Sequence, residues 1–320
     1  MPIVPSAYRA HGLFKNGHFS TIYSAKLRLA PKVRQERERL ILPDGDFLDL
    51  DHSTTQDPKG TAILLHGLEG NAQRTYMVGQ ANAMLEAGWN VCSVNFRGCS
   101  GEPNKNYDSY NAGRTEDLAA IVDHLVQQGQ HRLVLTGFSL GGNMLLKYLG
   151  EGRKVPEAVK AAVAISAPLN LKGSLEALTR NENYLYRTVF LTNLRRKFRK
   201  KIKDHPAMMN RTDYRQIDSL LAFDNIYTAK AHGFTDAYDY YAKSSSLQFL
   251  PGIEQPVLIL NAQNDSFLSP QCYPVSFAEN SKNIYLEMPK YGGHVGFHQR
   301  NKRYYSEDRT VQFLNKILGI

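Results

Sequence analysis

The chain has 320 residues, of which 42% are hydrophobic, and a formal net charge of +9. This length and composition suffice for a sizeable buried core within one α/β domain that carries insertions. The longest apolar runs, such as residues 61–65, are far shorter than the roughly 20 residues that span a bilayer, which excludes an integral membrane protein. Seven basic residues and no acidic one stand between Arg195 and Lys203, so the charge is local and does not indicate a nucleic-acid partner.

The cysteines suggest a reducing compartment. The chain has three cysteines, Cys92, Cys99 and Cys272, an odd number without the spacing of disulfide pairs. It does not begin with the charged-then-apolar pattern of a signal peptide. We therefore expect a cytoplasmic protein.

Residues 36–52 have the pattern of a β-hairpin. Two apolar runs flank Asp44-Gly45, a dipeptide typical of tight hairpin turns. The acidic residues Asp44, Asp46, Asp49 and Asp51 also raise the alternative of a calcium site, but the later bidentate glutamate of a calcium loop is missing. We favour a solvated hairpin face, and expect residues 1–60 to form an N-terminal segment and edge hairpin.

From residue 61 onward, short apolar runs alternate with helical patterns. The runs predict strands near 61–66, 90–96, 132–137, 161–167, 256–261 and 283–288. Such alternation predicts a mostly parallel sheet with helices on both faces, formed by residues 61–167 and 256–320. Residues 168–255 interrupt it with helical patterns and basic charge, which predicts an inserted helical cap. The helical spacing of Val311, Leu314 and Ile317 predicts an amphipathic helix at the end of the chain.

A serine stands between the third of these strands and the next helix, in the motif Gly137-Phe-Ser139-Leu-Gly141. Small residues on both sides of a serine at a strand-to-helix turn are typical of a nucleophile elbow, a strained turn that exposes the hydroxyl. The motif alone is a weak signal, and the flanking strand and helix patterns make it specific. We predict that Ser139 is a nucleophile.

A serine nucleophile needs a histidine base and a carboxylate that fixes the histidine tautomer. On a sheet of this kind they follow in the chain order serine, acid, histidine. Asp265 comes just after the strand expected at 256–261, and His294 follows the strand expected at 283–288 between glycines. We predict Asp265 and His294 in these roles. His298 is the competing histidine, and we expect it to be a partner near the site.

The negative oxygen that forms during acyl transfer needs two backbone donors. We expect them to be the amides of Leu140, after the nucleophile, and of Leu68, in the loop after the first parallel strand. We expect His66 to support that loop, and a charged or hydrogen-bonding role of its own toward the substrate is the alternative. Arg97 follows the second parallel strand, where it could bind a substrate anion or, in the interpretation we prefer, tie loops together.

The motifs together resemble the α/β-hydrolase superfamily, and within it the YheT-type subfamily, which is similar to eukaryotic α/β-hydrolase-domain lipases and embryogenesis-associated hydrolases. The resemblance spans nearly the whole chain and rests on residues 13–22, 66–70, 95–101, 137–142, 223–225 and 292–294. It implies the triad Ser139, Asp265 and His294. One departure is Ser266 after the acid, where the family pattern has proline.

The sequence therefore predicts a serine hydrolase that cleaves small-molecule acyl esters of short to medium chain length, without a cofactor or metal. A lipid-directed lipase or acyltransferase with the same triad is the alternative, and a non-catalytic binding protein is disfavoured because no triad member is missing. A haloalkane or epoxide hydrolase would carry an aspartate in place of Ser139. Arg195 to Lys203 could contact an anionic membrane weakly, or could simply be solvated beside an apolar stripe that covers the pocket.

Overall fold

The computed structural model describes residues 3–300 and 303–320, which contain a nine-stranded sheet in the order β1-β9-β8-β7-β6-β4-β5-β3-β2. The strands are β1 Ile3–Val4, β2 Glu36–Ile41, β3 Phe47–Ser53, β4 Thr61–Leu65, β5 Asn90–Asn95, β6 Leu133–Phe138, β7 Val159–Ile165, β8 Val257–Leu260 and β9 Ile284–Glu287. The pairs β2–β3 and β3–β5 are antiparallel and the others parallel, so the predicted edge hairpin and parallel sheet are confirmed.

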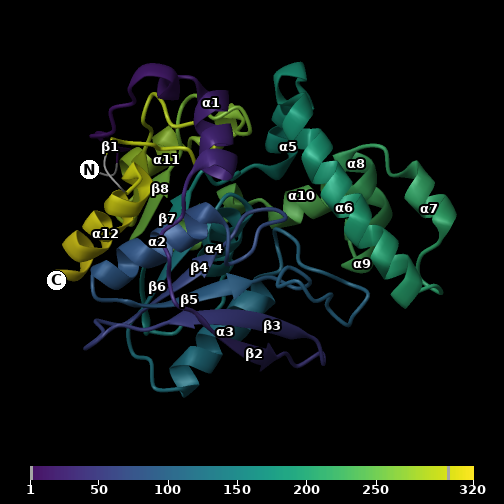
Figure 1. Cartoon of the computed structure of the whole chain (residues 1–320), viewed down its shortest axis with the longest axis horizontal. Helices are drawn as coiled ribbons and strands as arrows, with labels where there is room; N and C mark the ends of the chain where they lie inside the picture. The colour runs from purple at the N-terminus through teal and green to yellow at the C-terminus, as the bar shows by residue number, and fades with distance from the viewer. Residues whose placement is uncertain (1–2, 301–302) are drawn as a thin grey trace.

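Helices cover both faces of the sheet, as Figure 1 shows. One face packs on α2 Thr75–Glu86 and α12 Tyr305–Leu318, and the other on α3 Thr115–Gln127, α4 Leu140–Gly150 and α11 Val275–Asn280. Every residue of β4 and β6 is buried, as expected for parallel strands covered on two sides. The predicted C-terminal helix is confirmed as α12, since Leu314 is fully buried and Val311 and Ile317 pack against the same core.

A helical insertion separates β7 from β8, as predicted, and forms the teal and green lobe on one side of Figure 1. Its helices are α5 Leu171–Thr179, α6 Tyr184–Asp204, α7 Arg211–Gln216, α8 Leu220–Phe223, α9 Ala229–Ala231 and α10 Ala237–Ser244, with shorter turns η3 Asn181–Asn183, η4 Asp224–Thr228 and η5 Ser246–Gly252. An apolar cluster around Phe198 and Tyr227 gives this cap a core of its own. Within the described part of the chain, no helix is long and apolar enough to cross a membrane.

The N-terminal segment reaches the edge of the sheet where the strands end. Turn η1 Gly12–Lys15, helix α1 Gly17–Ile22 and the π-helical turn η2 Tyr23–Leu27 follow one another along it. In Figure 1 this purple helix lies beside the yellow-green C-terminal loops. A further turn, η6 Pro270–Cys272, follows β8.

Candidate active site

Ser139 occupies the turn between β6 and α4 with φ of +51° and ψ of −119°. Positive φ is uncommon for a residue with a side chain, and such strain often marks functional sites. The flanking glycines are required by close backbone contacts. A β carbon at Gly137 would collide with the carbonyl oxygen of Gly141, and one at Gly141 would lie 2.6 Å from that of Leu65. The turn therefore has the geometry of a nucleophile elbow.

Asp265 and His294 lie in contact although 29 positions separate them in the chain. Asp265 comes after β8 and His294 after β9, and His294 Nδ1 is 2.8 Å from Asp265 Oδ2. The other carboxylate oxygen, Oδ1, accepts a hydrogen bond of 3.0 Å from the backbone N–H of Phe267. Because an ionised carboxylate only accepts, Nδ1 is the donor, and Nε2 of the neutral imidazole is left to accept a proton.

The nucleophile and the histidine share one cavity. Ser139, Leu140, Leu68 and His294 all line a cavity of about 350 Å³, which also extends under the cap. The ring of Phe267 packs against the His294 imidazole with 4.3 Å between centroids. A substrate in this cavity would therefore meet both side chains.

The two expected backbone donors also border this cavity. Leu140 is the first residue of α4, so its N–H has no acceptor within the helix and lies at the positive end of the helix dipole. Leu68 follows Gly67, where a β carbon would lie only 3.1 Å from that of Ser139. The loop containing Leu68 thus approaches Ser139 closely, as the predicted two-donor oxyanion hole would require.

Comparison with known proteins agrees with this geometry. Residues 62–300 match the family model for the alpha/beta hydrolase fold. This chain belongs to the α/β-hydrolase family. It is 34% identical to YheT of Escherichia coli (strain K12), over 89% of this chain and 85% of that protein. It is 30% identical to the mouse protein named Phospholipase ABHD3, over 92% of this chain and 74% of the relative.

A solved structure supports the fold of this α/β hydrolase. The Pyrococcus furiosus esterase Pf2001 superposes with a TM-score of 0.58, covering 90% of this chain and 98% of that one. Its sequence identity is only 18%, so this likeness concerns the fold alone. The family assignment rests on the sequence relatives and on the family model.

His66 is fully buried at the start of the loop that contains Leu68. Its Nε2 accepts a hydrogen bond of 3.2 Å from the backbone N–H of Phe96, so Nδ1 carries the proton and donates to the carbonyl of Gly67 at 2.7 Å. Burial lowers the pKa of His66 to about 3, which keeps the ring neutral. Both ring nitrogens are therefore engaged by backbone groups, and the geometry is that of a residue that supports the loop.

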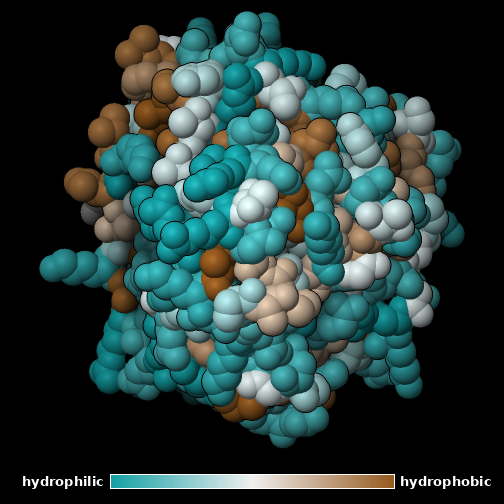
Figure 2. Space-filling view, turned by 90° about the vertical axis from the view of Figure 1, so that its right-hand side faces the viewer, coloured by the Kyte–Doolittle hydropathy of each residue, from teal (hydrophilic) through white to brown (hydrophobic). Residues whose placement is uncertain are grey.

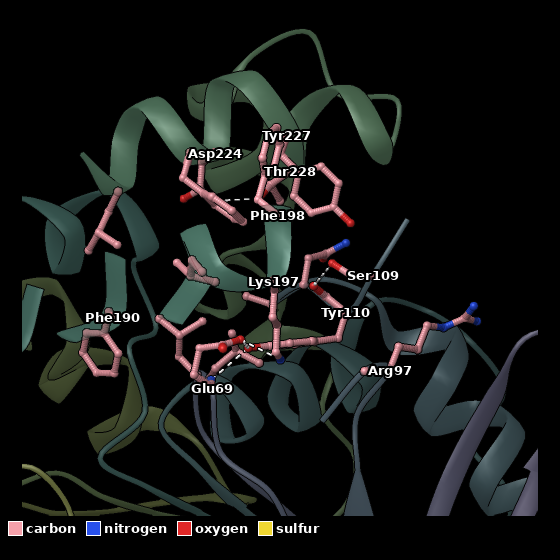
Figure 3. Close-up of a pocket in the computed structure, with 18 of the residues that line it drawn as sticks. Glu69, Arg97, Ser109, Tyr110, Phe190, Lys197, Phe198, Asp224, Tyr227 and Thr228 are labelled. Atoms are coloured by element: carbon pink, nitrogen blue, oxygen red, sulfur yellow. Dashed lines mark hydrogen bonds and ion pairs between the residues drawn. The ribbon is translucent and has the colours of Figure 1, made fainter. Parts of the chain in front are cut away.

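Arg97 lies at the cavity wall, but its guanidinium points away from the other labelled side chains in Figure 3. It makes two hydrogen bonds with Asp117, of 2.8 and 2.7 Å, and contacts Asp44 at 2.6 Å and Asp46 at 3.2 Å. Asp44 and Asp46 belong to the turn between β2 and β3, and Asp117 belongs to helix α3. The side chain thus ties the loop after β5 to the hairpin turn and to α3, and its charge is neutralised by these acids.

The acidic residues of the hairpin are matched with arginines. Arg39 pairs with Asp49 and Arg37 with Asp51, while Arg97 holds the other two aspartates of the run. Within residues 3–300 and 303–320, no cluster of histidine, cysteine, aspartate and glutamate suits a metal ion. The hairpin is therefore a network of ion pairs rather than the solvated face that we expected.

His298 lies in an aromatic cluster with the N-terminal segment. Its ring stacks on Phe14 with 3.8 Å between centroids and an angle of 4°, and it also contacts the rings of His11, Tyr23 and Tyr304. Burial lowers the pKa of His298. The structure therefore brings His294, and not His298, to Asp265.

Several cavity residues escaped the sequence analysis. Lys197 of the cap forms an ion pair with Glu69, which follows Leu68 in the loop after β4 (Figure 3). Asp224 lines the cap side of the cavity and accepts hydrogen bonds from Tyr241 and Thr228, of 2.6 and 2.7 Å. Burial raises the pKa of Asp224 to about 6. Of these residues, only Asp224 belonged to a motif of the family resemblance, Phe223-Asp224-Asn225, and the sequence analysis assigned no role to it.

Proposed function

We propose that this protein is a serine hydrolase that cleaves carboxylic esters through an acyl-enzyme on Ser139. The observation that carries the proposal is the hydrogen bond between Asp265 and His294 at the cavity that also contains the strained Ser139. A carboxylate-oriented imidazole that lines the same cavity as a half-buried serine is the arrangement that can activate a hydroxyl for attack on an acyl carbon.

The chemistry then proceeds in two halves. The Ser139 hydroxyl attacks the ester carbonyl while His294 Nε2 accepts its proton, and the N–H groups of Leu68 and Leu140 stabilise the negative oxygen. The C–O bond to the leaving alcohol breaks as His294 returns the proton to that oxygen. Water then attacks the acyl carbon while the same nitrogen accepts its proton. The bond from this carbon to Ser139 Oγ breaks as His294 returns the proton to Oγ, which releases the acid and free Ser139. These residues supply every group that the steps need.

The cavity favours short- to medium-chain acyl groups. Its lining beyond the triad is mainly apolar, with Leu171, Leu175, Phe190, Leu194 and Phe198 contributed by the cap. A volume of about 350 Å³ is at the small end of typical ligand pockets. Phe190, Leu194 and Phe198 recur every four residues along α6 and all line the cavity, which supports the interpretation that the apolar stripe of this helix covers the pocket.

A lipid-directed lipase or acyltransferase is the second candidate. The relatives include a protein named as a phospholipase, and α6 exposes Tyr184, Leu185 and Val189 beside its basic run. On the cap side of the molecule, Figure 2 shows hydrophobic residues gathered near one upper edge of a mainly hydrophilic face. Such a surface suits contact with aggregated lipid.

Only some residues of the basic run at 195–203 are free to contact a membrane. Four of its residues make contacts within the protein. Arg195 donates to the carbonyl of Ile217, and Arg199 donates to the hydroxyl of Tyr214. Lys197 pairs with Glu69, and Lys201 donates to the carbonyl of Asn106. Arg196, Lys200 and Lys203 are exposed and could contact an anionic surface. We therefore propose at most weak, salt-sensitive membrane contact through these three residues.

Hydrolysis of p-nitrophenyl esters from acetate to palmitate, with a glycerolipid panel beside it, tests the proposed activity. We expect the highest kcat/KM with short to medium chains, and no turnover by Ser139→Ala. Equal hydrolysis by the parent and by this variant would refute the mechanism. Preference for long-chain glycerolipids, or transfer of the acyl group to added alcohol, would favour the second candidate.

Sedimentation with vesicles tests the membrane contact. We expect anionic vesicles to retain more protein than neutral ones at low salt, and this excess to disappear at high salt. Equal retention on both kinds of vesicle at low salt would exclude the contact.

A further inference from the structure

The loop that carries His294 has an unusual backbone. Gly292, Gly293, Val295 and Phe297 have φ values of +145°, +57°, +56° and +22°. Positive φ suits the two glycines, but it is unfavourable for phenylalanine and especially for the β-branched valine. Strained residues of this kind persist only where the surrounding structure holds them.

A hydroxyl of the N-terminal helix holds the backbone of His294 itself. The His294 N–H donates a hydrogen bond of 2.8 Å to Thr21 Oγ1, and the Thr21 hydroxyl donates one of 2.8 Å to the carbonyl of Gly17. Thr21 is buried on α1. It therefore links the main chain of the proposed base to this helix.

The strained Val295 is held in the same way. Its carbonyl accepts a hydrogen bond of 2.9 Å from the Ser24 hydroxyl, and its N–H donates one of 3.0 Å to Ser166 Oγ. Thr21 and Ser24 both belong to the N-terminal segment, outside residues 62–300 that match the family model. Part of the support for the His294 loop thus comes from outside the matched region.

Helix α1 also contacts the loop after β8 that contains Asp265. A β carbon at Gly17 would collide with the carbonyl oxygen of Asn264, and one at Gly293 with that of Gly17. The Asn264 side chain accepts a hydrogen bond of 3.0 Å from the N–H of Gly293. Asn264 directly precedes Asp265, so one turn of α1 packs against the loops of both proposed catalytic partners.

We propose that Thr21 of helix α1 is a positioning residue for His294. Its hydroxyl fixes the main chain of His294, and so keeps the imidazole hydrogen-bonded to Asp265 and at the cavity wall. This inference rests on the proposed function. Thr21 acts on the base rather than on the substrate, so its loss lowers kcat and leaves KM nearly unchanged.

The test compares three variants of the full chain. Thr21→Val is nearly isosteric but lacks the hydroxyl, and Thr21→Ser restores it. Ser20→Ala is the matched control, because its hydroxyl is also buried on α1 and donates to a backbone carbonyl, that of Phe14, without contacting His294. We expect Thr21→Val to lose about 10- to 100-fold in kcat with KM within about twofold of the parent, and the other two variants to keep the parent kcat.

A second measurement separates this inference from the proposed function. The Nδ1 proton of His294, followed by NMR, should shift or broaden in Thr21→Val and stay unchanged in Ser20→Ala. Parent kcat in Thr21→Val, an equal loss in Ser20→Ala, or no rescue by Thr21→Ser would overturn the positioning role. Failure of the parent to hydrolyse any ester would refute the proposed function, and the NMR comparison would still decide whether Thr21 positions the histidine.

Discussion

Lys197 on the cap helix α6 lies 2.8 Å from the carboxylate of Glu69, the residue that follows the proposed oxyanion donor Leu68. Glu69 itself has a positive φ of +54°. The Tyr110 hydroxyl donates to the Glu69 carboxylate at 2.7 Å and accepts from the Glu69 N–H at 2.8 Å. Figure 3 shows this cluster at the cavity wall. The Lys197–Glu69 ion pair therefore links the cap to the loop that contains Leu68.

Replacement of Lys197 by methionine should loosen this link. We expect Lys197→Met to lower the free energy of unfolding by about 1–2 kcal/mol, because Glu69 stays buried without its cation, and to lower kcat/KM by about tenfold. The loss is smaller than for a fully buried pair, since the lysine side chain is 37% exposed. Urea unfolding and ester kinetics measure the two effects.

Two further variants define this coupling. Lys203→Met removes an exposed lysine of the same helix that does not line the cavity, and it should leave both quantities unchanged. Addition of Glu69→Gln to Lys197→Met should recover part of the lost stability, because no uncompensated charge remains. Equal behaviour of the two lysine variants would show that the ion pair does not couple the cap to the loop.

Asp265→Asn tests the orienting carboxylate. An asparagine at this position can present an N–H toward His294 Nδ1, which favours the wrong imidazole tautomer. We expect kcat to fall by about 10⁴-fold while the circular dichroism spectrum stays that of the parent. A decrease of less than tenfold would mean that another group orients the base.

His298→Ala tests the choice between the two histidines of the loop. His298 stacks on Phe14 in an aromatic cluster, so its loss should cost about 1 kcal/mol of stability and less than about tenfold in kcat. His294→Ala should cost several orders of magnitude in kcat. The assignment of the base would be wrong if the His298 variant were the more impaired of the two.

Asp224 gives a prediction about pH. Burial raises its pKa from 3.8 to about 6. Between these pH values the unfolded chain releases a proton that the folded protein keeps, so the stability contributed by Asp224 is present below pH 4 and is lost as the pH rises to 6. We expect Asp224→Asn, which cannot ionise, to gain about 2 kcal/mol relative to the parent between about pH 4 and pH 7.5.

Urea unfolding at the two pH values measures this gain. The control is Asp239→Asn, since a hydrogen bond from Lys243 lowers the pKa of Asp239 and its replacement should show no such gain. A pH-independent difference between the Asp224 variant and the parent would show that this carboxyl is not perturbed in the folded protein.

The positions of Ser139, Asp265 and His294 could be predicted because each follows a strand with a clear apolar pattern. In a parallel sheet those strand ends meet at one edge, so the chain order of the motifs is enough to bring the side chains together. The same periodicity located the edge hairpin, the inserted helices and α12. Strand β1 has only two residues, too few for any pattern to appear.

The contacts that support these residues could not be predicted in the same way. Thr21 and His294 are 273 positions apart, and Lys197 and Glu69 are 128 apart. No local pattern marks a threonine that accepts from a distant amide, or a lysine that turns from solvent toward a buried glutamate. The hairpin aspartates were misjudged for the same reason, because their arginine partners depend on the register of β2 with β3 and on the position of Arg97.

Covalent labelling of Ser139 is the most direct test of the proposed mechanism. A fluorophosphonate reacts with a serine only when a base and an oxyanion site activate it. We expect the intact mass of the parent to increase by one phosphonyl group, located by peptide mass spectrometry on Ser139, with ester hydrolysis lost in proportion, and Ser139→Ala to remain unlabelled and inactive. Labelling of a different residue in the parent, or hydrolysis by Ser139→Ala at the parent rate, would contradict an acyl-enzyme on Ser139.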